Sequence, residues 1–266
     1  MQPVGPYNEI RLVADSIQRC VTLIWPTEVV ERLLPVGMRL GEQCLTPPGT
    51  HPVNLFFHDM IRVHMNTPTL LPHMTYNEHV VGIPFVYTTR NWLNWVSSGP
   101  FYYMPILLLD DVFAMSGGRL WWGFPKSPAR FRTTRDSYLV RSLAGSPVVS
   151  LKYRATGPLR PISWYPRFEP MYHMMNQPII SALPLGMGPM YVCSDFDKVW
   201  SAARIRPIEA TTWIHSSYVL GLPTGRFPQK GYSPGIDRSW AGAFEIEVPW
   251  REGLPYPIWF HARGTE

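Results

Sequence analysis

The chain has 266 residues and carries 24 Lys and Arg against 19 Asp and Glu, a formal net charge of +5. Only 16% of the residues are charged and 45% are hydrophobic, which predicts a large apolar core and a surface poor in charge. The basic residues are scattered without a run of like charges, which argues against a nucleic-acid partner. No apolar run approaches the roughly 18 residues of a membrane-spanning helix, so no membrane partner is expected.

The cysteines do not form a recognisable framework. Cys20, Cys44 and Cys193 are odd in number, far apart and not arranged as CxxC pairs, which argues against a disulfide scaffold and a zinc ribbon. The sequence after Met1 lacks the pattern of a secretory signal peptide. We therefore expect a cytoplasmic protein with reduced thiols.

Runs of apolar and β-branched residues predict strands over residues 19–25, 53–65, 76–87, 101–109, 138–142, 148–153, 190–193, 208–213 and 244–248. Three short helices are expected: one after Pro26, one from Asp110 to Gly117 and Gly118, and one capped by Ser194. Many strands, few helices and no βαβ alternation predict a mainly β (α+β) fold, largely antiparallel and closed or strongly curved. No linker divides the chain, so a single domain over residues 1–266 is expected.

Lys126 is one of four lysines in the chain, and its neighbours in sequence include Trp121, Trp122, Phe124 and Pro125. Burial disfavours the ammonium form and lowers the pKa of a lysine by up to several units. A neutral amine adds to carbonyl groups and forms Schiff bases. The alternative is a surface lysine whose apolar stem lies on aromatic side chains.

Glu78 is a lone carboxylate among apolar residues of a predicted strand. If its side chain faces a pocket, it is suited to general acid–base catalysis. If the alternation of the strand turns it outward, it is an ordinary solvated glutamate. The five histidines between residues 51 and 79 lack the i, i+4 helical spacing of a zinc-binding pair, so no metal is expected.

Several short segments occur in a fixed order: Leu33-Leu34-Pro35, Tyr76-x-Glu78, Leu109-Asp110-Asp111, and Gly118-Arg119 seven residues before Pro125-Lys126. In the order and spacing of these segments, over roughly Val21 to Trp213, the chain resembles the acetoacetate decarboxylase family. Acetoacetate decarboxylase is itself a standard example of an enzyme with an activated lysine. The resemblance implies a cone-like, largely antiparallel β-barrel with flanking helices. It also implies that Lys126 forms an imine with a keto acid, that Glu78 is the active-site carboxylate, and that Arg119 supports the site.

The chain departs from the family pattern at three positions. Ser127 replaces a second lysine, so a lowered pKa of Lys126 would have to come from desolvation. The family's second glutamate is not matched, and the corresponding stretch holds Phe57, His58 and Asp59. Arg19 is the arginine nearest to the position from which the family binds the substrate carboxylate.

The resemblance and these departures together predict a Schiff-base-forming lyase. The predicted catalytic residues are Lys126, Glu78 and Tyr76, and the predicted substrate-binding residues are Arg119, Phe124, Trp122, His58 and Arg19. The altered polar residues favour aldol-type condensation and dehydration, or cyclisation, of a small keto acid such as pyruvate. Decarboxylation of a β-keto acid such as acetoacetate is one alternative, and a non-catalytic barrel that binds an apolar acid is another. No organic cofactor is required, and the low charge content and the family predict a homo-oligomer.

Overall fold

The computed structural model describes residues 10–67, 73–89, 99–182, 191–215, 221–229 and 242–258. The long strands are β1 (Arg11–Pro26), β3 (Thr50–Met65), β4 (Met74–Thr88), β5 (Phe101–Leu109), β14 (Arg204–Ile214) and β16 (Gly242–Gly253). The shorter strands are β2 (Met38–Leu40), β6 (Lys126–Pro128), β7 (Arg130–Thr134), β8 (Ser137–Arg141), β9 (Pro147–Ala155), β10 (Arg160–Pro161), β11 (Ile179–Ala182), β12 (Tyr191–Ser194), β13 (Phe196–Lys198), β15 (Gly225–Gln229) and β17 (Tyr256–Pro257). The helices are α1 (Thr27–Glu31), α2 (Val112–Trp122) and α3 (Glu169–Met175), with 3-10 turns η1 (Ile162–Trp164), η2 (Pro166–Phe168) and η4 (Trp200–Ala202).

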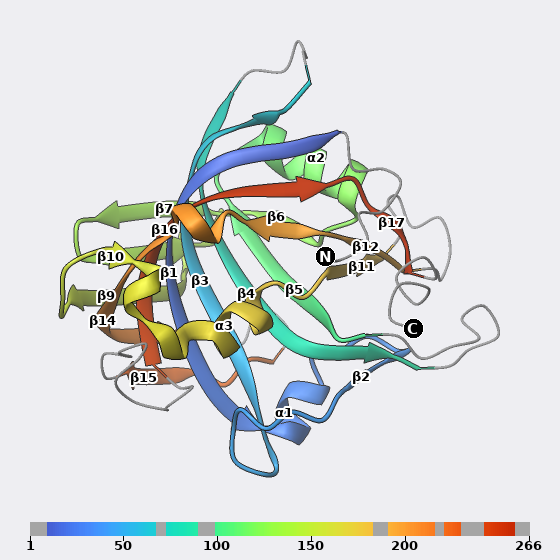
Figure 1. The fold of residues 1–266 in the computed structure, drawn as a ribbon, viewed down its shortest axis with the longest axis horizontal. Helices are drawn as coiled ribbons and strands as arrows, with labels where there is room; N and C mark the ends of the chain where they lie inside the picture. The colour runs from blue at the N-terminus through green and yellow to red at the C-terminus, as the bar shows by residue number, and fades with distance from the viewer. Residues whose placement is uncertain are drawn as a thin grey trace.

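The strands form one large mixed sheet that is strongly curved (Figure 1). Its centre runs in the order β16, β1, β3, β4 and β5, each antiparallel to the next. Strands β6 and β11 pair with β5 in parallel, and β14 continues the sheet from β16 toward β9, β8 and β7. The predicted mainly β, largely antiparallel architecture is confirmed. The sheet of described strands is open, so the expected barrel is a loose description of it.

The strand register brings the segments of the sequence motif together. His58 on β3 lies opposite Glu78 on β4, and Met60 lies opposite Tyr76. On the other side of β4, Leu107 of β5 pairs with Lys126 of β6. Because side chains alternate between the faces of a strand, residues two apart on β3 and β4 share one face of the sheet.

Helix α3 crosses one side of the long strands in Figure 1 and covers this face. Its residues Met171, Met174 and Met175 are almost fully buried and pack with Phe56 and Val80 of the strands. Unbranched methionine side chains fill irregular gaps well, which suits a short helix that closes the space over a curved sheet.

Helix α2 begins as predicted but extends further. The carboxylate of Asp111 caps it by accepting a hydrogen bond from the Ala114 backbone N–H at 2.7 Å. The helix was expected to end at Gly117 and Gly118, but it continues to Trp122 and ends at Gly123, whose φ of 69° is left-handed. The expectation was wrong because a glycine inside a helix also serves where another side chain packs closely.

The prediction of a helix after Ser194 is wrong. In its place, β13 pairs with β16, with Phe196 opposite Glu252 and Lys198 opposite Trp250. Burial alternates along β13, since Lys198 is buried and Asp197 is exposed. Pairing with a neighbouring strand therefore outweighs the local capping pattern.

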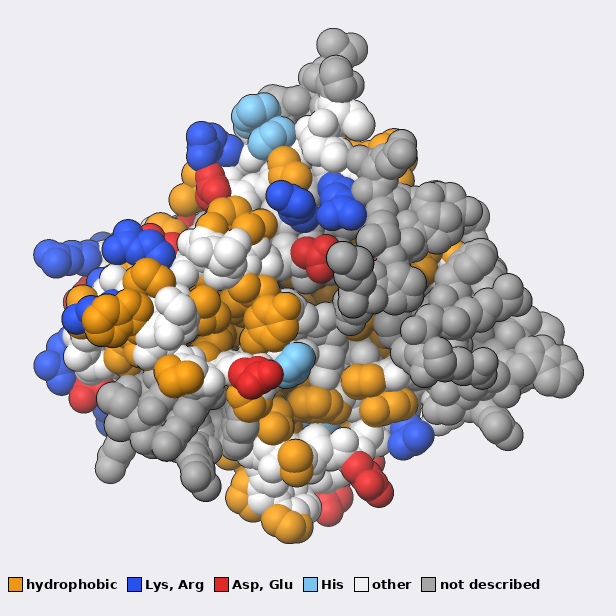
Figure 2. Space-filling model, viewed as in Figure 1, with side chains coloured by type: hydrophobic (Ala, Val, Ile, Leu, Met, Phe, Trp, Pro, Cys, Tyr) orange, Lys and Arg blue, Asp and Glu red, His pale blue; other side chains and the backbone are white. Residues whose placement is uncertain are grey.

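The face in Figure 2 carries hydrophobic side chains across its centre, whereas Lys and Arg gather mainly toward one margin and the top. This distribution matches the low charge content of the sequence. Among the described residues, no helix is long and apolar enough to cross a membrane.

Candidate active site

A cavity of about 80 Å³ lies among the long strands, β6, β13 and α3. Since one water needs roughly 10–15 Å³ by this measure, a small organic molecule fits. Most of the lining is apolar and includes Phe56, Met104, Leu107 and Phe124. The polar or titratable lining residues are Gln18, His58, Tyr76, Glu78, Tyr102, Lys126, Gln177, Lys198 and Glu252.

Lys126 and Glu78 form a buried ion pair at the centre of this lining. The Lys126 Nζ lies 3.1 Å from Glu78 Oε1, and both side chains are more than nine-tenths buried. His58 Nδ1 lies 3.7 Å from Glu78 Oε2, which is beyond a good hydrogen bond. Glu78 therefore lies between an amine within hydrogen-bond distance and an imidazole beyond it, so Lys126 is the group with which it can exchange a proton directly.

The electrostatics of the pair differ from the expected lowering of the Lys126 pKa. Burial lowers the pKa of Lys126, but the charge of Glu78 outweighs it and the net shift is upward. Burial raises the pKa of Glu78, yet Lys126 and His58 outweigh that effect and lower it to about 2. The pair is thus an ammonium and a carboxylate at neutral pH. The amine becomes a nucleophile only when its proton moves, and Glu78 is the nearest acceptor.

Tyr76 lies beneath the lysine. The Lys126 Nζ is 5.7 Å from the centre of the Tyr76 ring, within the range of a cation–π contact. Burial raises the pKa of the Tyr76 phenol, and Lys126 offsets only part of the increase. The phenol therefore stays protonated at neutral pH and is available as a proton donor.

The segment from Gly118 to Lys126 explains how the lysine is held. A Cβ atom at Gly118 would lie 2.5 Å from Lys126 Cδ and 2.5 Å from Cε, so only glycine leaves room for the lysine stem. Arg119 Nε donates a hydrogen bond to the Lys126 carbonyl at 2.6 Å. Arg119 itself is exposed and lies outside the cavity lining, so it fixes the backbone of Lys126 without reaching the cavity.

Glu252 was not expected in the site. It lies on β16, lines the cavity, and accepts a hydrogen bond from Ser194 Oγ at 3.1 Å. Burial raises its pKa to about 8, with Lys126 and Ser194 acting in the opposite direction. A second carboxyl group, protonated at neutral pH, therefore lies in the cavity beside the charged Glu78. Continuing the alternation of Phe244, Ile246 and Val248 along this strand leads to Glu252.

Lys198 was also not expected in the site. It lies on β13, is 8% exposed, and lines the same cavity. Burial lowers its pKa to about 8, and Cys20 and Asp197 oppose the shift. The sequence prediction missed Lys198 because it placed a helix here. The segment is instead strand β13, whose alternation turns Lys198 and Phe196 toward the cavity.

The cavity lining contains buried polar atoms without a hydrogen-bond partner among the described residues. They include Gln18 Oε1, both ring nitrogens of His58, and Trp250 Nε1. Buried polar groups in proteins nearly always have a partner, so such a concentration marks a place that a polar ligand or water fills. The unpartnered atoms include an acceptor, Gln18 Oε1, and a donor, Trp250 Nε1, so this lining suits a small polar molecule that both donates and accepts hydrogen bonds.

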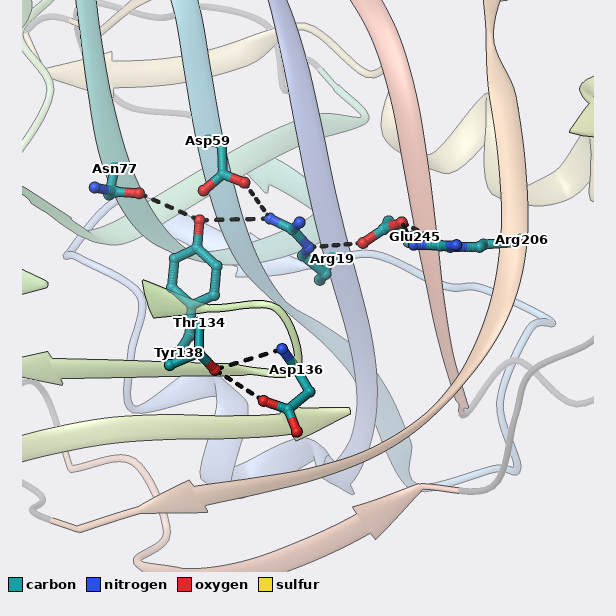
Figure 3. A network of polar contacts seen from close by, with 8 residues as sticks. All are labelled: Arg19, Asp59, Asn77, Thr134, Asp136, Tyr138, Arg206 and Glu245. Carbon is teal, nitrogen blue, oxygen red and sulfur yellow. Dashed lines mark hydrogen bonds and ion pairs between the residues drawn. The ribbon is translucent and has the colours of Figure 1, made fainter. Parts of the chain in front are cut away.

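Besides Arg119, two predicted substrate-binding residues lie outside the lining. Arg19 follows Gln18 on β1 and therefore points to the opposite face of the sheet. Figure 3 shows it between Asp59 and Glu245, and its Nε lies 2.8 Å from Glu245 Oε2. Trp122 is buried elsewhere and donates from Nε1 to the Gly253 carbonyl at 2.9 Å, which fastens α2 to the end of β16.

The histidines do not assemble into a metal centre. His51 Nε2 contacts the Pro84 carbonyl at 2.8 Å, and His79 Nδ1 contacts the Phe56 carbonyl at 2.9 Å. Within the described ranges, no group of three or more His, Cys, Asp or Glu side chains is placed to hold a metal ion. Of the five histidines, His58 is the one that lines the cavity.

A buried lysine–glutamate pair thus lines a mostly apolar cavity of a curved, largely antiparallel sheet. The family model for acetoacetate decarboxylase (ADC) matches residues 2–155, more than half of the chain. The chain therefore belongs to the acetoacetate decarboxylase family.

Solved structures share the fold at low sequence identity. Acetoacetate decarboxylase from Legionella pneumophila superposes with a TM-score of 0.57 at 14% identity, covering 96% of this chain and 87% of the other. The enduracididine biosynthesis enzyme MppR, complexed with the condensation product of pyruvate and imidazole 4-carboxaldehyde, superposes with a TM-score of 0.52 at 12% identity. The match covers 94% of this chain and 88% of the other. A search of curated proteins finds no significant match.

Proposed function

We propose that this protein is a lyase that forms a Schiff base between Lys126 and a small keto acid. The observation that carries the proposal is the contact of 3.1 Å between Lys126 Nζ and Glu78 Oε1 inside an apolar cavity. An amine buried beside a proton acceptor has both parts that imine formation needs.

The first step moves the proton of the Lys126 ammonium to Glu78, which removes both buried charges. The free amine then attacks the ketone carbon, and the carbonyl oxygen takes up two protons and leaves as water. One proton comes from the attacking nitrogen, and protonated Glu78 or the phenol of Tyr76 supplies the other. The product is a protonated imine, which withdraws electrons from the neighbouring carbon.

The imine supports two reactions. In condensation, a proton leaves the carbon next to the imine, and the enamine carbon bonds to an aldehyde carbon whose oxygen takes up a proton. A second proton then leaves the former enamine carbon, while the new hydroxyl takes up another proton and departs as water. In decarboxylation, the bond to a β-carboxylate breaks instead, its electrons form the enamine, and carbon dioxide leaves. The protonated carboxyl of Glu252 adds a proton donor that serves the aldehyde oxygen in the first reaction.

We favour condensation and dehydration, or cyclisation, of a pyruvate-like acid. Ser127 replaces the family's second lysine and lies outside the cavity lining, so the site departs from that of the decarboxylase. Proteins of this fold include both an acetoacetate decarboxylase and an enzyme complexed with pyruvate, so the fold accommodates either outcome. Decarboxylation of a β-keto acid is the second candidate, because its first step uses the same Lys126 and Glu78.

Reductive trapping tests the proposal. The protein is incubated with pyruvate or acetoacetate, borohydride is added, and the mass of the intact protein is measured. We expect a stable adduct in the wild type and none in Lys126→Met. Failure of both keto acids to give an adduct with folded protein would overturn the proposal and favour a binding protein for an apolar acid.

Product analysis separates the two reactions. With pyruvate and an aldehyde, condensation and dehydration give a conjugated product that absorbs in the ultraviolet. Release of carbon dioxide from acetoacetate at an enzymatic rate would instead establish decarboxylation. The single domain over residues 1–266 and the homo-oligomer are further proposals, which limited proteolysis and light scattering test.

A further inference from the structure

The cavity contains a second amine, and its surroundings differ from those of Lys126. Lys198 Nζ lies 4.6 Å from the centre of the Phe196 ring and 5.9 Å from that of Trp200. In the described part of the chain, no carboxylate lies within ion-pair distance of it. The neighbouring Asp197 points to the exposed side of β13. Lys198 is thus a buried cation whose close contacts in the described structure are two aromatic rings.

The other strong cations near the site are already paired. Lys126 faces Glu78, Arg19 faces Asp59 and Glu245, and Arg119 is bound to the Lys126 carbonyl. Lys126 and Lys198 are the lysines or arginines that line the described cavity. Lys198 is therefore the one among these cations with room for a ligand anion.

The charges of the cavity lead to the same conclusion. The opposite charges of Lys126 and Glu78 cancel, while Glu252, with a pKa of about 8, is mostly protonated at neutral pH. The ammonium of Lys198 is left without compensation. A buried charge is costly unless it is paired, so the cavity is electrostatically completed by a single negative charge on the ligand.

We propose that Lys198 binds the carboxylate of the substrate keto acid. The proposal rests on the proposed function, because it assigns the carbonyl group of the same molecule to Lys126. Strands β16, β1, β3, β4 and β5 lie between β13 and β6 in the sheet, so the two amines enter the cavity from different walls. A keto acid anchored at Lys198 then presents its ketone toward Lys126. Lys198 lacks the adjacent carboxylate that would move protons to and from the reacting groups during imine formation, which favours a binding role.

The test compares ligands that share one group at a time. Pyruvate carries the carboxylate and the ketone, acetone carries the ketone alone, and lactate carries the carboxylate without a ketone. Imine formation with pyruvate and acetone is followed by borohydride trapping over a range of concentrations, and lactate binding by calorimetry. The variants are Lys198→Met, Lys198→Gln and a control, Lys152→Met, at an exposed position on β9.

We expect Lys198→Met to raise the half-saturating pyruvate concentration by at least about tenfold, because loss of one partner of a buried charge pair strongly weakens binding. Trapping by acetone should stay within about twofold of the wild type, since it lacks the anionic group. Lactate binding should weaken with pyruvate binding, and Lys152→Met should change none of these. Replacement of a buried charge by an isosteric apolar side chain preserves the fold, and Lys198→Gln provides a second variant.

Equal effects on pyruvate and acetone, no effect on either, or an adduct mapped to Lys198 would overturn the inference. Failure of the wild type to trap either ketone would instead refute the proposed function. In that case lactate still decides the role of Lys198 as an anion site: unchanged affinity in Lys198→Met refutes it, and a loss confined to that position supports it.

Discussion

Gly118 lies directly against the side chain of Lys126. A Cβ atom at Gly118 would come within 2.5 Å of both Cδ and Cε of the lysine and 3.3 Å of Nζ. The glycine thus belongs to the site although it has no side chain, because its absence of a Cβ shapes the channel for the lysine stem. The adjacent Arg119 holds the Lys126 carbonyl, so both members of the Gly-Arg motif act on one lysine.

Substitution of this glycine separates site geometry from helix stability. Gly118→Ala should reduce reductive trapping at Lys126 by at least about tenfold and destabilise the protein by roughly 1–3 kcal/mol, the usual cost of overpacking. Gly117→Ala is the matched control, because its Cβ would meet nothing within 4 Å in the same helix. That variant should keep wild-type trapping and gain roughly 0.5–1 kcal/mol of stability from helix propensity. Trapping at the wild-type level in Gly118→Ala would contradict this role.

Glu78→Gln should lower the pKa of Lys126 and yet reduce turnover. Removal of the carboxylate leaves burial as the main influence, so the pKa of Lys126 falls and its acetylation by acetic anhydride begins at a lower pH. Turnover should nevertheless drop by at least about 100-fold, because the proton acceptor is lost. Glu31→Gln on the exposed face of α1 is the control. An unchanged pH profile of acetylation would show that the ion pair does not determine the pKa of Lys126.

Glu252 should leave a signature in the pH dependence of stability. Its pKa rises from an ordinary 4.5 to about 8 on folding, so the folded state binds the extra proton between these values. The contribution of Glu252 to the free energy of unfolding therefore falls as pH rises from about 5 toward 8. The total decrease is about 1.4 kcal/mol per unit of pKa difference. Urea denaturation should show that Glu252→Gln lacks this decline. Parallel stability curves for the two proteins would refute a buried neutral carboxyl group.

Arg19 should prove structural rather than substrate-binding. Arg19→Met leaves Asp59 without its cation and Glu245 with Arg206 alone, which should destabilise the protein by about 3 kcal/mol. The folded variant should keep the pyruvate affinity of the wild type, because Arg19 points away from the cavity. A selective loss of pyruvate affinity without a loss of stability would place Arg19 in the substrate site.

The sequence was sufficient to predict the β-rich fold and to nominate the part of the candidate site that lies on consecutive motif segments. Glu78 and Lys126 were identified because their spacing follows a family pattern, and strand register then brings them together. Asp110 and Asp111 likewise predicted the start of a helix, and the structure shows that Asp111 caps it. These features depend on local sequence and on neighbouring strands.

The rest of the site depends on pairing between distant strands. Glu252 and Lys198 enter through β16 and β13, and neither has a motif around it. Ser194 and Asp197 fit a helix cap so well that the inward alternation of Lys198 was overlooked. Arg19 was placed in the site because it was the nearest arginine, although its neighbour Gln18 faces the cavity. A one-residue difference in strand position reverses the direction of a side chain.

The central claim is that Lys126 is the amine that bonds to the substrate. The most direct measurement is peptide mapping by mass spectrometry of wild-type protein trapped with pyruvate and borohydride. We predict that the reduced adduct lies on the peptide that contains Lys126, and that Lys198 and Lys152 stay unmodified. An adduct on Lys198 with Lys126 unmodified, or no adduct under conditions in which the protein is folded, would contradict the account.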